Sequence, residues 1–361
     1  MAHETFFIGS YTIVDDWIPN ATGDGISRLE LDCETGAFGH VGPVAAVENP
    51  SYLTLSPDGR VLFACSELFH EDGHVWTLAA ESDGGLRPVT ERTSLGRATC
   101  HVAFDPVRNR VFASSYLDGR VVGYDTDGAE LVDGPVVLEY EGEGPNRNRQ
   151  ESSHPHQVVA SGGAYFVPDL GADRIWVHDA GAPGAVVRAA IGTPPGCGPR
   201  HLIFHPELPV MYVVCELEPR VLVYERGDSD GSWTLVGDHH SELPERAAEA
   251  APAAIKLHPS SRTLTVSNRF SDSLQQLSVD PESGRLSAGR NVRLAGKTPR
   301  DFTFSSDGRW LIALCQDSSE AISYSVDPET GVMGAEPTDR LEIGTPVCII
   351  SAAPGRAATR G

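Results

Sequence analysis

The chain has 361 residues, of which 40% are hydrophobic and 22% charged, a balance typical of a globular protein. Its formal net charge of −22 argues against nucleic acid and anionic membranes as partners. No stretch approaches the ~18 apolar residues of a membrane-spanning helix, so we expect no membrane partner either.

One sequence phrase recurs seven times along the chain. Each copy has a small residue or proline, a polar or aromatic residue, an apolar strand, a Pro/Asp/Gly turn and a second apolar strand. The copies begin at Pro50, Thr99, Pro155, Pro199, Pro252, Pro299 and Pro346. A four-stranded unit repeated every ~40–50 residues predicts an all-β, seven-bladed β-propeller with antiparallel blades.

The two ends of the chain are predicted to share one blade. Residues 5–11 are an apolar strand at the N-terminus, and residues 345–350 form an inner strand at the C-terminus. Pairing them closes the ring and removes an exposed strand edge. We therefore expect one propeller domain over residues 1–352 and a disordered tail at 353–361.

A single blade can be followed in residues 199–236. Three apolar strands are predicted at 201–204, 211–215 and 220–225, with a fourth near 234–236 after a glycine-containing turn. Long polar inserts at 141–153 and 239–251 lead into the inner strands of the next blades. We expect both inserts to overhang the rim where those strands begin.

Polar residues gather at one rim of the predicted disc. Because strands alternate in direction within a blade, the start of the innermost strand and the end of the next strand lie on the same face. The strand starts carry Tyr52, His101, His156, Arg200 and Arg300, and the strand ends carry Glu67, Tyr116, Asp169, Glu216, Asn268, Arg269 and Gln316. Different blades thus bring these groups to one rim, which predicts a site around the axis.

The residue types at this rim indicate acid–base chemistry on an anion. Arginines bind carboxylate or phosphate oxygens in a forked geometry, and a histidine with a glutamate can move protons near neutral pH. The nucleophile sequence Gly-x-Ser-x-Gly is absent, and no metal-ligand spacing is present. We therefore expect no metal and no cofactor.

Simpler structural interpretations of these residues stay open. Arg200 and Glu216 can be an ordinary ion pair at strand ends, and Arg269 and Arg300 can balance nearby aspartates. His154 and His156 flank Pro155 and can act as caps, and Asp169 can shape a turn. For His101 and Tyr116 a structural role and a functional role are equally open.

Several segments together resemble one known family. They are residues 153–159 (Ser-His-Pro-His-Gln-Val-Val), 167–175 (Val-Pro-Asp-Leu-Gly-Ala-Asp-Arg-Ile), 198–206 (Gly-Pro-Arg-His-Leu-Ile-Phe-His-Pro), 266–269 (Val-Ser-Asn-Arg) and 299–302 (Pro-Arg-Asp-Phe). Along nearly its whole length the chain resembles the lactonase family of seven-bladed propellers. That family includes bacterial 6-phosphogluconolactonases and the fungal enzyme that cyclises 3-carboxymuconate.

The resemblance implies a particular set of site residues. The muconate cyclase uses one histidine, one glutamate and two arginines, which match His156, Glu216, Arg200 and Arg269 by local motif. It implies catalytic roles for these four. Around them, Arg300, His101, His154, Tyr116, Glu67, Asp169 and Gln316 are the expected substrate-binding residues.

Three functions follow as alternatives. The first is a lactone-opening carboxylic-ester hydrolase of carbohydrate metabolism, similar to 6-phosphogluconolactonase, in which either His156 or Glu216 is the general base. The second is a cycloisomerase, an intramolecular lyase similar to the muconate cyclase. The third is a non-catalytic propeller that serves as a binding platform. The first two require a small anionic lactone or carboxylate as substrate.

The remaining expectations concern compartment and assembly. The seven cysteines are scattered, odd in number and free of Cys-x-x-Cys spacing, which is typical of buried reduced thiols. The first residues lack the charged-then-apolar pattern of a signal peptide. We therefore expect a cytoplasmic protein, and a monomer because a propeller with closed edges is self-sufficient.

Overall fold

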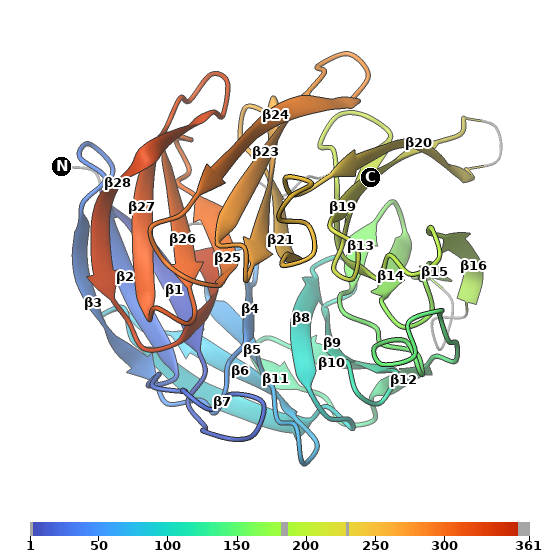
Figure 1. Ribbon diagram of the computed structural model, residues 1–361. Coiled ribbons are helices and arrows are strands. Elements are labelled where there is room, and N and C mark those ends of the chain that lie inside the picture. The colour runs from blue at the N-terminus through green and yellow to red at the C-terminus, as the bar shows by residue number, and fades with distance from the viewer. Residues whose placement is uncertain (1–2, 182–186, 229–230, 353–361) are drawn as a thin grey trace.

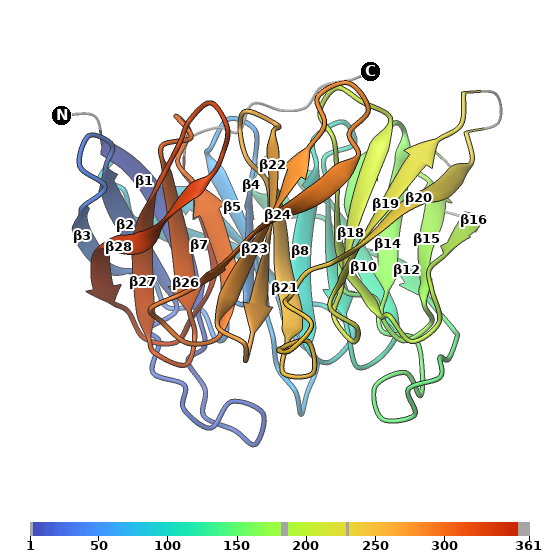
Figure 2. The same ribbon diagram turned by 45° about the horizontal axis from the view of Figure 1, so that its top comes forward.

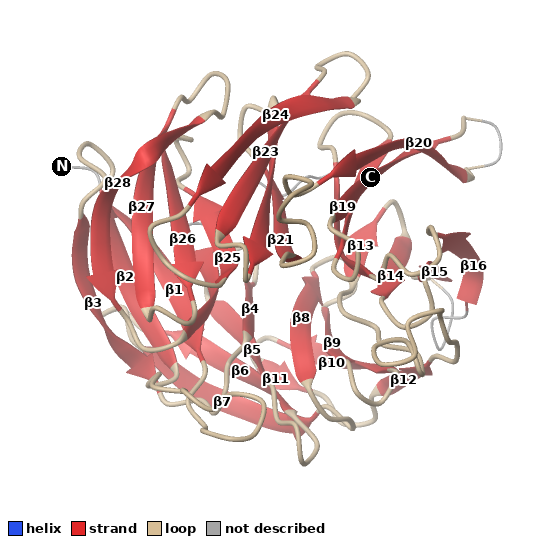
Figure 3. Ribbon diagram, in the orientation of Figure 1, coloured by secondary structure: helices blue, strands red, loops and turns tan. Residues whose placement is uncertain are grey.

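The computed structural model describes residues 3–181, 187–228 and 231–352, and in these residues all regular secondary structure is β-strand (Figures 1 and 3). The strands form seven antiparallel sheets arranged around a central axis, which confirms the predicted propeller. The predicted tail at 353–361 lies outside the described residues.

The first three blades follow one another along the chain. Blade 1 consists of β4 (Tyr52–Leu55), β5 (Val61–Ser66), β6 (His74–Ala80) and β7 (Leu86–Thr93). Blade 2 consists of β8 (Thr99–Asp105), β9 (Arg110–Ser115), β10 (Arg120–Asp127), β11 (Glu130–Leu131) and β12 (Val136–Glu139). Blade 3 consists of β13 (Val159–Ser161), β14 (Ala164–Asp169), β15 (Arg174–Asp179) and β16 (Val187–Gly192). In blade 2 the outermost strand is split, because β11 and β12 pair with different halves of β10.

The next three blades repeat the four-stranded order. Blade 4 consists of β17 (Pro199–Phe204), β18 (Val210–Cys215), β19 (Arg220–Arg226) and β20 (Trp233–His240). Blade 5 consists of β21 (Ala251–Leu257), β22 (Thr263–Arg269), β23 (Ser273–Val279) and β24 (Leu286–Arg293). Blade 6 consists of β25 (Pro299–Phe304), β26 (Trp310–Cys315), β27 (Glu320–Val326) and β28 (Met333–Glu342).

Blade 7 is built from both ends of the chain, as the sequence predicts. Its strands are β29 (Pro346–Ser351), β1 (His3–Ser10), β2 (Ile26–Asp32) and β3 (Phe38–Ala45). Within it β29 pairs with β1 from Phe6↔Ser351 to Ser10↔Pro346. The ring therefore closes through backbone hydrogen bonds between residues more than three hundred positions apart.

The hydrophobic core lies between neighbouring blades, as β18 illustrates. Successive side chains of a strand point to opposite faces of the sheet. Met211 and Val213 pack towards blade 3, whereas Tyr212 and Val214 pack towards blade 5. Every residue of β18 is buried, since each blade is covered on both faces by its neighbours. This stacking fixes the inner strands around the axis and so positions the site.

Candidate active site

The inner strands of blades 2, 4 and 6, like that of blade 7, begin with the same backbone irregularity. In blades 2, 4 and 6 the antiparallel register shifts by one residue close to the first residue of the inner strand. The residues left without a register partner are Cys100, Arg200 and Arg300. Such a bulge re-aims a side chain, and all three residues line one pocket on the axis. In blade 3, His156 occupies the equivalent place in the repeat and lines the same pocket.

The ends of the second strands complete this axial pocket, which has a volume of about 180 Å³. The residues that come from these strand ends are Glu67, Tyr116, Glu216, Arg269 and Gln316. Loops add the rest: Tyr11, Trp17, Ile18, Phe69, Ala98, Leu117 and Arg149. Starts of inner strands and ends of second strands therefore meet at one rim. Figure 2 shows the loops that follow β1 and β12 projecting from the same face of the disc.

Glu216 lies at the centre of the cationic side of the pocket. Arg200 Nε donates to Oε2 at 3.0 Å, and Arg269 Nη2 lies 2.9 Å from the same oxygen. Arg149 Nη2 donates to Oε1 at 2.7 Å. Burial alone would raise the pKa of the Glu216 carboxyl, but Arg269, Arg200 and Arg149 hold it well below its usual range. Glu216 is therefore an ionised carboxylate with both oxygens engaged.

A second carboxylate, that of Glu67, lines the same pocket as Glu216. Glu67 Oε2 accepts from the Tyr11 hydroxyl at 2.6 Å and from Arg300 Nη2 at 3.4 Å. The Arg300 guanidinium also lies over the Tyr11 ring, 5.2 Å from its centroid. Burial alone would lower the pKa of Arg300, but Tyr11, Glu67 and Glu216 raise it. The Arg300 guanidinium therefore stays charged.

Charge in the pocket does not balance. Four arginines, Arg149, Arg200, Arg269 and Arg300, meet only two carboxylates, Glu67 and Glu216, among the residues that line it. Burial, then the neighbouring Arg269, lowers the pKa of Arg200 to about 10, which leaves it charged at neutral pH. The pocket therefore carries about two positive charges in a chain of net charge −22. An anionic ligand would offset them.

His156 also lines this pocket and forms no ion pair with a described residue. Its side chain is buried, and Cys100 Sγ lies 3.6 Å from its Nδ1. Burial, and then Arg200, lower the pKa of His156 well below the ordinary value, against the opposing effect of Glu216. The imidazole is therefore neutral at pH 7 and able to accept a proton.

One wall of the pocket mouth is aromatic. Trp17 and Phe69 stack with ring centroids 5.2 Å apart and nearly parallel planes. Trp17 is 60% exposed although it is a large apolar side chain, so its outer face is open to a ligand. The pocket is therefore lined by both apolar aromatic groups and arginines.

Three of the residues expected at the site do not line the pocket. His101 follows the bulged Cys100 by one residue and packs against Tyr52, with ring centroids 4.1 Å apart and planes tilted by 33°, beside the buried His201. His154 is buried with Nδ1 2.8 Å from the Tyr116 carbonyl oxygen, and its ring stacks on Tyr116.

Asp169 is the third of these residues. Its buried carboxylate accepts hydrogen bonds from Ser153 Oγ, from the His154 amide and from Trp176 Nε1. These contacts anchor the end of the 141–153 insert to β14 and β15. Asp169 and His154 do not line the pocket. They support two residues that do, because His154 contacts Tyr116 and Asp169 holds the backbone just before His156.

Sequence reasoning missed several residues that line the pocket. Arg149 lies in the insert 141–153, which was expected to overhang this rim, so its region was found but its side chain was not. Cys100 stands in register with Arg200 and Arg300 within the repeat, so a strict alignment of the repeats would have selected it in place of His101. Nothing in the sequence pattern pointed to Tyr11 or Trp17.

The other insert, 239–251, contributes no lining residue to the axial pocket. Its Glu242 is buried and accepts hydrogen bonds from Ser271 and Ser273.

The part of the chain that the structure describes contains no group of three or more side chains placed to hold a metal ion. Within the same residues no helix is long and apolar enough to cross a membrane. All seven cysteines are free thiols, although Cys197 and Cys215 lie with their sulfur atoms 3.2 Å apart.

Fold and pocket together define a class: a seven-bladed β-propeller with a net positive, titratable pocket on its axis. Comparison with known proteins then gives the family. The sequence profile of "Lactonase, 7-bladed beta-propeller" matches residues 5–351. The chain belongs to this lactonase family, which confirms the resemblance seen in the sequence.

Several relatives match over nearly their whole length. A 6-phosphogluconolactonase of Bacillus subtilis is 26% identical over 347 residues, covering 95% of this chain and 97% of the relative. A 6-phosphogluconolactonase of Formosa agariphila is 25% identical, covering 94% and 97%. The solved structure of a periplasmic gluconolactonase of Pseudomonas aeruginosa superposes with a TM-score of 0.87 at 27% identity, covering 97% of this chain and 99% of that one.

Proposed function

We propose that this lactonase family member hydrolyses the ring ester of an anionic sugar lactone, and that 6-phosphogluconolactone is the substrate to test first. The observation that carries the proposal is the excess of arginines over carboxylates around His156. The names of the Bacillus and Formosa relatives support a phosphorylated sugar lactone. The gluconolactonase similarity supports the same ester chemistry on the sugar ring.

The arginines supply the binding energy for the anion. A phosphate monoester carries a charge of ~−1.5 to −2 at pH 7, which matches the two uncompensated positive charges of the pocket. Arg300 and Arg269 belong to different blades, so each reaches the substrate from its own direction. Guanidinium groups can bind two oxygens at once, which orients the lactone as well as holding it.

His156 is the group best suited to be the general base. Glu216 is a poor one, since guanidinium groups occupy both of its oxygens. The His156 imidazole is neutral and open to a proton. Cys100 is an unsuitable nucleophile because burial raises the pKa of its thiol well above the ordinary value.

The reaction then proceeds in two proton-coupled steps. His156 removes a proton from water while the hydroxide forms a bond to the lactone carbonyl carbon. The carbonyl oxygen becomes an oxyanion, which Arg200 or Arg269 stabilises. Next the bond between this carbon and the ring oxygen breaks, and the imidazolium returns its proton to the ring oxygen. The product is the open-chain hydroxy acid, ionised at neutral pH.

The same charge excess supports a second candidate, the cycloisomerase. A substrate with two or three carboxylates would also offset the arginines, and one of its carboxylates would close onto an alkene while an acid protonates the adjacent carbon. In the free pocket His156 is neutral and Glu216 is ionised, so neither of them is ready to protonate carbon. This difference favours hydrolysis over ring closure.

An assay with the purified protein tests the proposal by measuring the protons that are released when the lactone is hydrolysed. We expect hydrolysis of 6-phosphogluconolactone above its spontaneous rate, and slower hydrolysis of unphosphorylated gluconolactone. His156→Asn is expected to abolish the catalysed rate, whereas Arg147→Gln, an exposed arginine of the insert, is expected to leave it unchanged. Consumption of 3-carboxymuconate without uptake of water, with both lactones untouched, would show that the cycloisomerase assignment is correct instead.

A further inference from the structure

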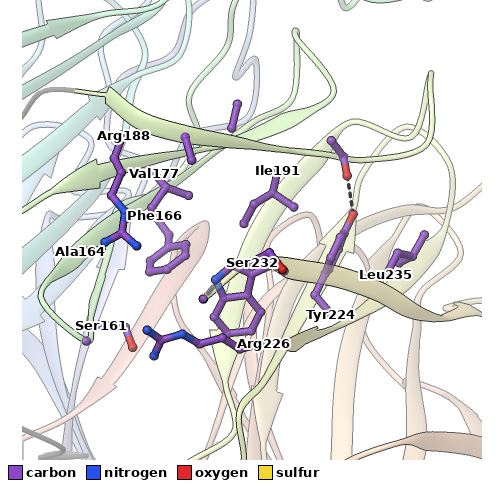
Figure 4. A pocket seen from close by; sticks show the side chains of 16 residues that line it. Ser161, Ala164, Phe166, Val177, Arg188, Ile191, Tyr224, Arg226, Ser232 and Leu235 are labelled. Atoms are coloured by element: carbon purple, nitrogen blue, oxygen red, sulfur yellow. Dashed lines mark hydrogen bonds between the residues drawn. The ribbon is translucent and has the colours of Figure 1, made fainter. Parts of the chain in front are cut away.

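A second and larger cavity lies far from the axis, between blades 3 and 4. It has a volume of about 360 Å³, twice that of the axial pocket. Residues of β14–β16 form one side, and residues of β19, β20 and the turn before β20 form the other (Figure 4). We call it the blade 3–4 groove. Volumes of ~300–1,000 Å³ are typical of small-molecule sites.

The floor of the groove is apolar and largely aromatic. Phe166 and Ile191 come from blade 3, and Tyr224 and Trp233 from blade 4. Trp233 meets Phe166 edge to face, with ring centroids 6.0 Å apart. The Tyr224 hydroxyl donates to the Gly192 carbonyl oxygen at 2.8 Å and joins the two outer strands at one end. The floor is therefore a fixed surface for an apolar group.

Two arginines from different blades flank this floor. Arg188 belongs to β16 and Arg226 to β19, and both are exposed. A side-chain carbon placed on Gly231 would lie 3.6 Å from Arg226 Nη2 and 3.9 Å from Arg188 Nη2, so both guanidinium groups reach the same point. Among the described residues neither forms an ion pair or a side-chain hydrogen bond, although acidic residues outnumber basic ones in the chain.

Arginines at other blade junctions are used differently. Arg92 of blade 1 pairs with Asp133 of blade 2 at 2.9 Å. Arg285 of blade 5 donates to the Val236 carbonyl oxygen of blade 4 at 2.9 Å. Each of these side chains ties its blade to the next. Within the described residues Arg188 and Arg226 make no such connection, and no described carboxylate pairs with either charge beside this apolar surface.

We propose that the blade 3–4 groove binds a small amphiphilic organic anion. The aromatic or aliphatic part of the ligand lies on Phe166, Ile191 and Trp233, and a single carboxylate or sulfonate bridges Arg188 and Arg226. Such an anion satisfies both features of the groove at once, since it buries apolar surface and removes the repulsion between two like charges. The site is separate from the axial pocket and does not depend on the reaction proposed there.

Two other occupants fit the groove less well. Residues 353–361 of this chain contain Arg356 and Arg360 and no acidic residue, so their side chains carry the same sign of charge as the groove. A second copy of the chain would need an acidic, partly apolar segment in register with both arginines. The experiment below distinguishes these cases.

Calorimetric titration with naphthalene-2-carboxylate, and with its neutral analogue naphthalene-2-carboxamide, tests the proposal on the full-length protein. We expect the carboxylate to bind at least about tenfold more tightly, as charge-assisted hydrogen bonds require. Arg188→Gln/Arg226→Gln should remove this preference and leave binding of the carboxamide unchanged. Ala189→Phe, which fills the groove, should abolish binding of both probes. Arg92→Gln is the matched control and should behave as the parent.

Melting temperatures of all variants establish that they are folded, and sedimentation of parent and double variant gives their oligomeric state. Carboxylate bound to the axial pocket would persist in the double variant as a separate site. The proposal is overturned if the parent binds neither probe, if the carboxylate and the carboxamide bind equally, or if the double variant retains the full preference. A parent that self-associates through the groove, with dissociation in the double variant, would show that a second copy is the occupant instead.

Discussion

Arg149 Nη2 donates to Glu216 Oε1 at 2.7 Å, although the two residues stand 67 positions apart in the chain. Glu216 is buried at the end of β18, whereas the Arg149 side chain is 44% exposed on an insert between blades. The same nitrogen of Arg149 also donates to the Tyr116 hydroxyl at 3.1 Å. A loop specific to one blade junction thus adds to the effect of Arg269 and Arg200, which also keep this central carboxylate ionised.

Removing this arginine should weaken catalysis without unfolding the protein. In Arg149→Gln the pocket loses one positive charge, and the pKa of Glu216 rises towards its ordinary value. Hydrogen bonds to charged groups contribute ~1.5–3 kcal/mol, so we expect kcat/KM for the anionic lactone to fall about 10- to 100-fold. Arg147→Gln is the control, because Arg147 lies in the same insert and pairs only with Glu143 among the described residues. Parental kcat/KM in Arg149→Gln would mean that Arg149 does not contact the substrate's transition state.

The pH dependence of hydrolysis should report the lowered pKa of His156. A base that is neutral in the free protein keeps its activity as the pH falls through 6.5, so the acidic limb of kcat/KM should lie below pH 6.5. Because Arg200 contributes to the lowering, a bound anion that offsets its charge should raise the pKa again. The acidic limb of kcat, which reports the complex, should therefore lie at higher pH than the limb of kcat/KM. Identical limbs for both parameters would contradict this account.

The sequence predicted the ring but not the detailed register of its inner strands. The repeated phrase and the pairing of residues 5–11 with 345–350 follow from hydrophobic alternation and turn residues, which are local signals. The bulge at Cys100, Arg200 and Arg300 falls directly after the first residue of each copy and moves the side chain that faces the axis by one position. For that reason Arg200 and Arg300 were placed correctly through their motifs, whereas His101, one residue beyond the bulge, was expected at the pocket in place of Cys100.

Contacts between distant loops were beyond the reach of pattern analysis. Trp17 stacks on Phe69 only because blades 7 and 1 are neighbours in the closed ring. Arg149 reaches Glu216 through the path of an irregular insert. Both relationships depend on tertiary packing, and neither residue stands in a repeated position of the sequence.

Three buried histidines should make the protein sensitive to acid. Burial lowers the pKa of His101 to about 3 and, with the charge of Arg200, lowers those of His156 and His201 well below the ordinary value. Below pH 6.5 these three groups alone let the unfolded chain bind up to three more protons than the folded one, so the free energy of unfolding falls as the pH falls. The slope reaches up to about 4 kcal/mol per pH unit.

Urea unfolding between pH 7.5 and 5 measures this slope. His101→Phe keeps a ring against Tyr52 and removes one titrating group, so we expect its slope to be smaller than that of the parent by up to about 1.4 kcal/mol per pH unit. His70→Phe, at an exposed loop position, is the control and should leave the slope unchanged. A free energy of unfolding that stays constant down to pH 5 in the parent would contradict the pKa assignments.

The aromatic wall at the pocket mouth should act on substrate binding rather than on the chemical step. Trp17 lines the pocket and is 60% exposed, so its ring can pack against the C–H face of a sugar ring. In Trp17→Ala this contact is lost in the ground state and the transition state alike, so KM should rise about three- to tenfold while kcat stays within about twofold of the parent.

Trp17→Phe should restore most of the affinity, since a six-membered ring can still stack on Phe69. Val107→Ala, which removes another exposed apolar side chain outside the pocket lining, should change neither parameter. A fall in kcat with unchanged KM for Trp17→Ala would instead place this side chain close to the reacting carbonyl.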